Sequence, residues 1–152
     1  MKEINIGFIG FGNMGSAMAK GLLKTNSIAK DRIWACARNF EKLKNTCADL
    51  GIHACTDANE VVEKSDMVIL AVKPYQLEDV IAPVKEQLKD KIVISIAAGK
   101  PFAALEPLLA AGTAHLSTIP NTPISTGNGV IVCEQTHSLN AVQLSLFETL
   151  FS

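Results

Sequence analysis

The sequence predicts an α/β domain in which helices cover both faces of a doubly wound, mostly parallel β-sheet. Short β-branched apolar runs alternate with longer amphipathic stretches, which is the pattern of strand–helix–strand units. A glycine-rich turn joins the first apolar run to the first helical stretch. A length of 152 residues suits one domain, 1–152, and a content of 48% hydrophobic and 19% charged residues excludes a disordered chain.

The first strand–helix units are marked by apolar runs and glycines. The run Ile4–Ile9 predicts a strand, and apolar residues at helical spacing across Ala17–Leu23 predict the helix after the glycine turn. Ile33–Ala37 predicts the second strand. The next helix is expected to end at Gly51, because glycine readily adopts the left-handed conformation of a helix C-cap. A short third strand is expected at Ile52–Ala54.

Capping residues and prolines bound the middle elements. Asp57 is expected to be the N-cap of a short helix, with Glu60 as its partner in a capping box. The run Met67–Val72 is continuously apolar, which predicts a strand buried on both faces, and Lys73-Pro74 ends it. Apolar spacing predicts one helix through Val80–Leu88.

The last third begins with a further strand, Ile92–Ala98. Pro101 is expected in the first turn of a helix that reaches Leu109 and is closed by Gly112. Two more strands are expected, Ala114–Ile119 and Gly129–Cys133, separated by turn-rich sequence.

The final stretch, Asn140–Phe151, predicts an amphipathic helix without a glycine, a proline or a basic last turn at its end. The chain therefore looks like a fragment that is cut within a helix. A short exposed terminal helix is the alternative.

Charge and cysteine spacing exclude several classes of function. A net charge of −1 without a Lys/Arg block gives no electrostatic footprint for nucleic acid or an acidic membrane. No signal peptide and no run of about 18 apolar residues is seen, so a cytoplasmic protein is expected. The cysteines lack metal-ligand spacing, so we expect no metal site and reduced, mostly buried thiols; they are Cys36, Cys47, Cys55 and Cys133.

The glycine motif Gly10-x-Gly12-x-x-Gly15 stands between a strand and a helix, as a Rossmann-type dinucleotide-binding fold requires. Gly10 is expected to permit the tight turn, Gly12 to let backbone approach a pyrophosphate, and Gly15 to let helix and strand pack closely. The phosphates would lie on the helix N-terminus. A glycine-rich turn in an unrelated α/β fold is the alternative.

The residue after the second strand selects the dinucleotide. An NAD-binding domain places Asp or Glu there for the ribose 2′-hydroxyl, whereas this chain has Arg38-Asn39. A guanidinium suits a 2′-phosphate, so the sequence favours NADP (NADPH), with NAD as a possible second cofactor. The alternative is that Arg38 is a solvent-exposed cation in a surface loop and binds no phosphate. Trp34, on the same strand, is expected near the adenosine site.

Small side chains mark the carboxyl ends of the next two strands, where doubly wound folds bind ligands. Ala71 and Val72 at the end of one strand, and Ala97 and Ala98 at the end of the next, would let backbone approach a nicotinamide or its ribose. Lys73 would donate a hydrogen bond to a ribose hydroxyl or a carbonyl. The alternative is that Lys73 is a surface lysine without a role in binding.

Four blocks together resemble pyrroline-5-carboxylate reductases, and they span essentially the whole chain. They are Ile6 to Gly15 (IGFIGFGNMG), Ala71 to Pro74 (AVKP), Ser95 to Gly99 (SIAAG) and Pro120 to Pro123 (PNTP). The resemblance implies reduction of 1-pyrroline-5-carboxylate to L-proline with NAD(P)H, the last step of proline biosynthesis.

The resemblance also assigns residues to a binding site. It implies that the pyrophosphate loop is Gly10, Phe11, Gly12, Asn13 and Met14, and that Arg38 and Asn39 contact the 2′-phosphate. Asn59 would contact the adenosine end of the cofactor, and Val72, Lys73 and Ala98 would contact the nicotinamide side. Asn121 and Thr122 would contact the substrate.

The family continues into a helical dimerisation domain that supplies most of the substrate pocket, and this segment is absent from the 152 residues. We therefore expect the chain to bind NADP(H) with little or no turnover by itself, and the full-length protein to be a homo-oligomer that acts on a small molecule.

Reduction of a protonated imine depends mainly on positioning, because the cofactor supplies the hydride. No catalytic residue is assigned, and His53, His115 and His137 are given no role. Two alternatives stay open. One is an NADP-linked oxidoreductase similar to the β-hydroxyacid dehydrogenases, and the other is a non-catalytic, reductase-like dinucleotide-binding module.

Overall fold

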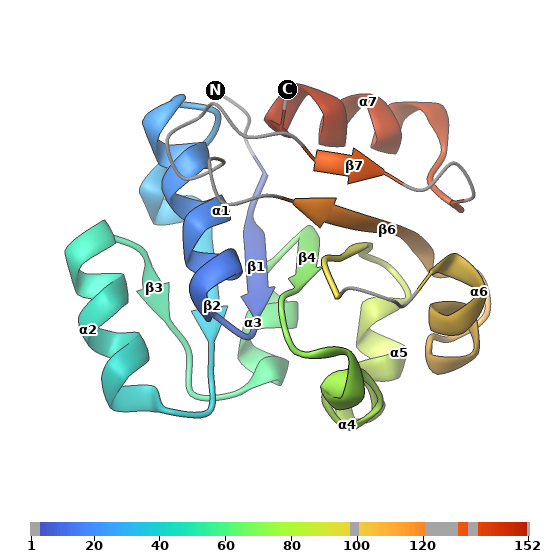
Figure 1. Ribbon diagram of the computed structural model, residues 1–152, viewed down its shortest axis with the longest axis horizontal. Helices are drawn as coiled ribbons and strands as arrows, with labels where there is room; N and C mark the ends of the chain where they lie inside the picture. The colour runs from blue at the N-terminus through green and yellow to red at the C-terminus, as the bar shows by residue number, and fades with distance from the viewer. Residues whose placement is uncertain (1–3, 98–100, 121–130, 134–136, 152) are drawn as a thin grey trace.

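The structure is a computed structural model that describes residues 4–97, 101–120, 131–133 and 137–151. Within these residues one seven-stranded sheet has the order β3-β2-β1-β4-β5-β6-β7 (Figure 1). Its strands are parallel except for β7, which pairs antiparallel with β6. The bounds are β1 Ile6–Ile9, β2 Ile33–Cys36, β3 His53–Ala54, β4 Met67–Leu70, β5 Ile92–Ser95, β6 Ala114–Pro120 and β7 Ile131–Cys133. The predicted doubly wound α/β fold is confirmed.

Helices cover both faces of the sheet. The larger ones are α1 Asn13–Lys24, α2 Phe40–Leu50, α3 Ala58–Lys64, α4 Leu77–Ile81, α5 Lys85–Leu88, α6 Phe102–Leu105 and α7 Ala141–Phe151. Buried residues of α1, α2 and α7 share one hydrophobic cluster, and those of α3, α4, α5 and α6 share the other. The two clusters are the layers on either side of the strands.

Alternate residues of each central strand enter the two clusters. Phe8 of β1 pairs in register with Ile69 of β4, and both belong to the cluster under α1. Their neighbours Ile9 and Leu70 belong to the opposite cluster. Because both faces are buried, these strands read as continuous apolar runs in the sequence rather than as alternating ones.

Side-chain caps begin several helices as the sequence predicts. The Asp57 carboxylate accepts a hydrogen bond from the Glu60 N–H at 2.9 Å, at the start of α3. The Glu60 side chain meets the Thr56 hydroxyl at 3.3 Å, so the observed pairing differs from the predicted return bond to Asp57. Gly51 ends α2 with a φ of +79°, as a left-handed C-cap should.

Two prolines change the predicted helices. The expected helix through Val80–Leu88 is divided into α4 and α5 by a 3₁₀ turn at Ala82–Val84, because Pro83 has no N–H and its ring excludes a regular α-helical turn. In the same way a 3₁₀ turn containing Pro107 follows α6.

The ends of the α6 region also differ from the prediction. Pro101 is the N-cap of α6 rather than a residue of its first turn. Gly112 has a φ of +88° in a turn beyond Leu108, where the 3₁₀ turn ends, so it does not close the helix directly. The helical pattern of the sequence locates this region, and the prolines decide its detailed form.

The start of α7 carries a reciprocal cap. The Asn140 amide oxygen accepts from the Gln143 N–H at 2.8 Å, and the Gln143 amide oxygen accepts from the Asn140 N–H at 2.9 Å. Phe147 and Leu150 of this helix are buried against the sheet. The helix therefore adds to the core of the domain.

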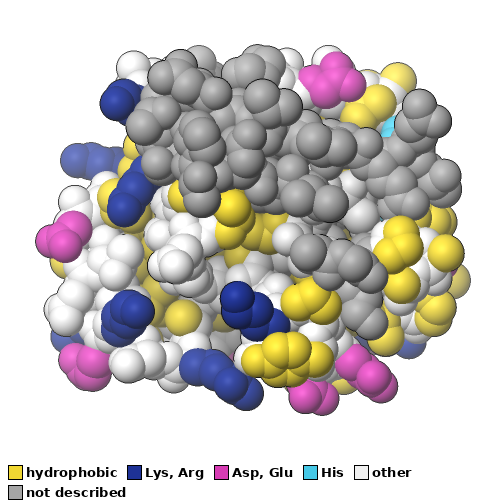
Figure 2. Space-filling model, in the orientation of Figure 1, with side chains coloured by type: hydrophobic (Ala, Val, Ile, Leu, Met, Phe, Trp, Pro, Cys, Tyr) yellow, Lys and Arg dark blue, Asp and Glu magenta, His cyan; other side chains and the backbone are white. Residues whose placement is uncertain are grey.

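Charged side chains of both signs are interspersed on the face shown in Figure 2, and hydrophobic side chains gather at its right, over α6. Within the described part of the chain, no helix has the length and apolar character needed to cross a membrane.

Candidate dinucleotide-binding site

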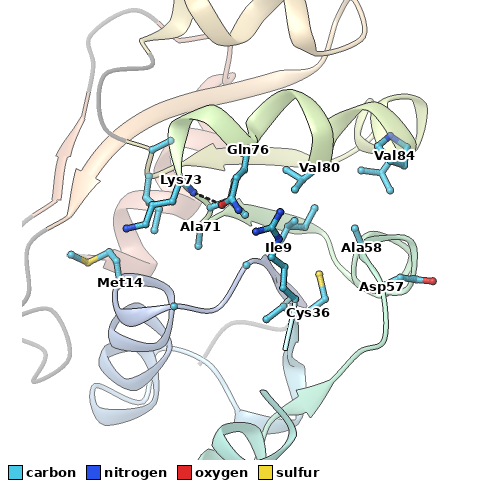
Figure 3. A pocket seen from close by; sticks show the side chains of 18 of the residues that line it. Ile9, Met14, Cys36, Asp57, Ala58, Ala71, Lys73, Gln76, Val80 and Val84 are labelled. Carbon is cyan, nitrogen blue, oxygen red and sulfur yellow. Dashed lines mark hydrogen bonds between the residues drawn. The ribbon is translucent and has the colours of Figure 1, made fainter. Parts of the chain in front are cut away.

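A cavity of about 780 Å³ opens at the carboxyl ends of β1, β2 and β4 (Figure 3). Parallel strands bring their carboxyl ends to one edge of the sheet, so turns that are far apart in the sequence meet there. The lining residues are Ile9, Gly10, Gly12, Asn13, Met14, Cys36, Ala37, Arg38, Thr56, Asp57, Ala58, Asn59, Ala71, Val72, Lys73, Pro74, Gln76, Val80, Pro83, Val84, Ile96 and Ala97.

The glycine turn forms one wall of this cavity. Gly10 has a φ of +87°, and its N–H donates to the Cys36 carbonyl at 2.9 Å, which ties the turn to the end of β2. A Cβ at Gly10 would lie 2.6 Å from Val72 Cγ1 and 2.7 Å from the Ala71 carbonyl oxygen. The turn thus needs glycine at this position for both its conformation and its packing.

The other two glycines have the expected surroundings. Gly12 is the N-cap of α1, and a Cβ there would meet no atom of the described structure within 4 Å. A Cβ at Gly15 would lie 3.1 Å from the Ala71 Cβ, where α1 packs closely against the turn after β4. The first turn of α1 holds no acidic residue. Its free N–H groups can therefore receive an anion without competition from a carboxylate.

Arg38 is exposed and lines the cavity two residues after the end of β2. Asn39, next to it, is the N-cap of α2, and its amide oxygen accepts from the Lys42 N–H at 3.1 Å. Asn39 is not among the lining residues. The structure thus brings the Arg38 side chain to the cavity and gives Asn39 a local capping bond.

Asn59 lies in the first turn of α3 and lines the cavity with its neighbour Ala58. Its amide oxygen accepts a hydrogen bond from Gln87 Nε2 at 3.1 Å. The amide nitrogen of Asn59 is then the atom left to donate to a ligand.

The turn after β4 faces the glycine turn. Ala71, Val72 and Lys73 all line the cavity, and the Lys73 N–H donates to Gln76 Oε1 at 3.0 Å (Figure 3). Lys73 is exposed and Ala71 is half-buried. Arg38 and Lys73 are the cationic lining residues and Asp57 is the acidic one, so the cavity suits an anionic ligand.

Some of the predicted residues lie elsewhere. Phe11 is not a lining residue; its ring packs edge-on against Phe8, with centroids 5.5 Å apart. It supports the turn from the core side. Ala98, Asn121 and Thr122 lie outside the described residues.

Three apolar lining residues, Val80, Val84 and Ile96, were not predicted from the sequence. Val80 and Val84 contribute from α4 and its 3₁₀ extension, and Ile96 contributes from the segment just after β5, beside the predicted Ala97. A signal was present, because the helical spacing of Val80 and Val84 puts both on one face of that segment. The same pattern is equally typical of a core-facing helix.

Burial raises the pKa of the three cysteines whose side chains are described. The pKa values of Cys36 and Cys47 are raised to about 11, and that of Cys55 to about 12, mainly because burial disfavours the thiolate. All three are free thiols, as predicted. Within the described residues, no group of His, Cys, Asp and Glu could hold a metal ion.

Trp34, which the sequence analysis expected near the adenosine site, is not a lining residue of the cavity. Its ring stacks on His53 at a centroid distance of 3.9 Å, and Lys64 Nζ lies 5.8 Å from its centroid. The strand explains the difference, because Trp34 is near the amino end of β2 and Arg38 follows the carboxyl end.

His115 is fully buried on β6, with its Nε2 3.2 Å from Glu106 Oε2 and its ring stacked on that of Phe102. It belongs to the packing between β6 and the α6 region and does not line the cavity.

A doubly wound sheet with this glycine turn and a cavity across its switch point defines a dinucleotide-binding α/β domain. Residues 5–99 match the family described as NADP oxidoreductase, coenzyme F420-dependent. The chain belongs to this family.

The relatives support the resemblance to pyrroline-5-carboxylate reductases. The enzyme of that name from Treponema pallidum is 43% identical over 141 residues, which cover 90% of this chain and 53% of the relative. The one from Methanosarcina acetivorans is 41% identical over 122 residues, 80% of this chain and 45% of the relative. The chain thus spans about half the length of the curated relatives it matches.

Solved structures agree with the sequence relatives. The pyrroline carboxylate reductase of Plasmodium falciparum, crystallised with NADP bound, matches 99% of this chain and 55% of its own, with a TM-score of 0.86 and 27% identity. The resemblance drawn from the four sequence blocks is confirmed.

Proposed function

We propose that this chain is the cofactor-binding part of a pyrroline-5-carboxylate reductase, which reduces 1-pyrroline-5-carboxylate to L-proline with NADPH. The observation that carries the proposal is the cavity in which the glycine turn, Arg38 and Lys73 meet at one edge of the sheet. The identity of the substrate is inferred from the names of the relatives.

The cavity fits a dinucleotide. The open space beside Gly12 admits a diphosphate against the backbone, and the N-terminus of α1 stabilises its charge. Arg38 is the group for a 2′-phosphate, and the apolar wall that contains Val80 and Val84 suits an adenine ring.

The bound cofactor supplies a hydride, and this chain's residues bind and orient it. Val72 and Lys73, on the turn after β4, are the nicotinamide-side contacts, together with Ala98. The apolar side chains of Val72 and Ala98 allow the nicotinamide to approach the backbone, and the Lys73 ammonium can donate a hydrogen bond to a ribose oxygen. Positioning of this kind lowers the barrier by fixing the orientation of the reacting groups in advance.

Substrate binding involves Asn121 and Thr122 and depends on further residues that the longer relatives possess. We propose that the complete protein is a cytoplasmic homo-oligomer that does not bind nucleic acid, and that this chain alone turns over little or no substrate. The curated relatives reported above favour this function over a β-hydroxyacid dehydrogenase or a non-catalytic module.

The test is an assay of the complete protein with pyrroline-5-carboxylate and NADPH, following the loss of NADPH absorbance and the formation of proline. We expect oxidation of NADPH that requires the imine, and a slower rate with NADH at equal concentration. A preparation that binds NADPH but forms no proline would contradict the substrate. Substantial turnover by this chain alone would contradict its dependence on the remaining protein.

A further inference from the structure

Gln76 contributes a polar side chain to the cavity. It is half-buried in the 3₁₀ turn Pro74–Gln76, between the cavity residues Lys73 and Val80. Figure 3 shows its amide reaching from this turn toward the middle of the cavity, with the hydrogen bond to Lys73 drawn.

The hydrogen bond to Lys73 fixes the orientation of this amide. The Lys73 N–H is a donor, so the atom of Gln76 that faces it at 3.0 Å is the oxygen Oε1. The amide nitrogen Nε2 is therefore the other atom, and it carries two N–H donors. Among the residues that the structure describes, no hydrogen-bond acceptor for Nε2 is found. The side chain thus presents a held, unused donor to the cavity.

The turn that anchors Gln76 is the one that packs against the glycine turn. Lys73 follows Val72, whose side chain nearly fills the space beside Gly10. Gln76 consequently lines the same cavity as Gly10 and Gly12, where the diphosphate is proposed to bind.

We propose that Gln76 is a cofactor-binding residue whose Nε2 donates a hydrogen bond to an oxygen of the diphosphate–ribose part of the bound dinucleotide. Oε1 stays bonded to the Lys73 N–H and holds the donor in place. This part is common to NADPH and NADH, so Gln76 strengthens the binding of both cofactors equally, in contrast to Arg38. The inference rests on the proposed dinucleotide-binding function.

Two substitutions separate a donor from a residue that only caps the turn. Gln76→Glu keeps an oxygen for the Lys73 N–H and replaces the donor by an anion. Gln76→Met keeps the length of the side chain and removes both groups. The methionine variant removes the donor without adding a charge, so a donor role predicts that it too binds both cofactors less tightly. The glutamate variant keeps the cap, so loss of the cap cannot explain weaker binding by that variant.

The measurement is the dissociation constant of this chain for NADPH and for NADH by titration calorimetry, with the melting temperature of each free variant. We expect Gln76→Glu to weaken both cofactors by roughly tenfold to a hundredfold, from loss of a hydrogen bond and repulsion of a phosphate. We expect Gln76→Met to weaken both by roughly fivefold. The melting temperature of Gln76→Glu should stay close to that of the wild type.

Gln143→Glu is the matched control. Gln143 makes the same kind of local bond, accepting from the Asn140 N–H at 2.9 Å, and it does not line the cavity. This variant adds an equal charge and should bind both cofactors like the wild type.

The outcomes keep the inference separate from the proposed function. Wild-type affinity in Gln76→Met or in Gln76→Glu overturns the role of Nε2. A loss confined to NADPH overturns the assignment to the diphosphate–ribose part. If the wild-type chain binds neither cofactor, the proposed function itself fails.

Discussion

Gly10 and Val72 approach each other so closely that a Cβ on Gly10 would lie 2.6 Å from Val72 Cγ1. The turn after β1 and the turn after β4 therefore share one small space at the switch point of the sheet. The φ of +87° at Gly10 makes glycine necessary there for a second reason. Both turns also line the cavity, so packing of the fold and shape of the site depend on the same contact.

Gly10→Ala is expected to destabilise the domain by roughly 3 kcal/mol, because a left-handed conformation in a non-glycine residue and overpacking each cost about 1 to 3 kcal/mol. Urea unfolding followed by circular dichroism measures the change. An unaltered free energy of unfolding would mean that the turn relaxes without strain. Val72→Ala in the same background relieves the side-chain clash and should recover part of the loss.

Gly12→Ala is expected to separate binding from folding. The added Cβ meets no described atom within 4 Å, and a φ of −82° suits alanine, so the loss of stability should stay below about 1 kcal/mol from the weaker N-cap. The methyl group occupies the space proposed for the diphosphate. We therefore expect NADPH and NADH affinities to fall by about tenfold or more, equivalent to at least about 1.4 kcal/mol. Full affinity would show that the diphosphate does not contact this backbone.

The sequence predicted the layout of the sheet because its signals are local and agree with one another. Strands such as Met67–Leu70 are buried on both faces and read as apolar runs, and glycines at positions 10, 12 and 15 have the packing expected of them. Helix caps at Asp57 and Gly51 were likewise predictable from residue type.

Other features depend on tertiary contacts that one sequence does not display. Gln76 is a polar residue in a short turn, and only the fold brings its amide beside the cavity. Trp34 lies on the expected strand, but near its amino end, and it does not line the cavity. The break at Pro83 also shows that apolar periodicity locates a helical region more reliably than its continuity.

Arg38→Ala tests the preference for NADPH. Loss of a charge-assisted contact with the 2′-phosphate should weaken NADPH by about 1.5 to 3 kcal/mol, and NADH should be nearly unchanged. Arg32→Ala is the control, because it removes the same charge from a residue that does not line the cavity. Arg32 immediately precedes β2, at the amino end of the strand. Calorimetric titration of both variants with both cofactors measures the effect. Equal losses for NADPH and NADH in Arg38→Ala would show that Arg38 does not contact the 2′-phosphate.

The buried thiols predict a loss of stability in alkaline solution. Burial raises the pKa of Cys47 from 9.0 to about 11 in the folded chain, whereas in the unfolded chain the thiol has its ordinary pKa. Between these values the unfolded state releases a proton that the folded state retains. Raising the pH therefore favours unfolding. The contribution of Cys47 is fully present below pH 9 and is lost as the pH rises toward 11.

Each such thiol lowers the free energy of unfolding by up to about 1.4 kcal/mol per pH unit within this range. Lysines and tyrosines also titrate in alkaline solution, so the informative quantity is the difference between two proteins. Cys47→Ala removes one thiol that does not line the cavity, and its free energy of unfolding should fall less steeply above pH 9 than that of the wild type. Denaturant titrations at several pH values measure both slopes. Parallel slopes would mean that the Cys47 thiol keeps the same pKa in the folded and the unfolded chain.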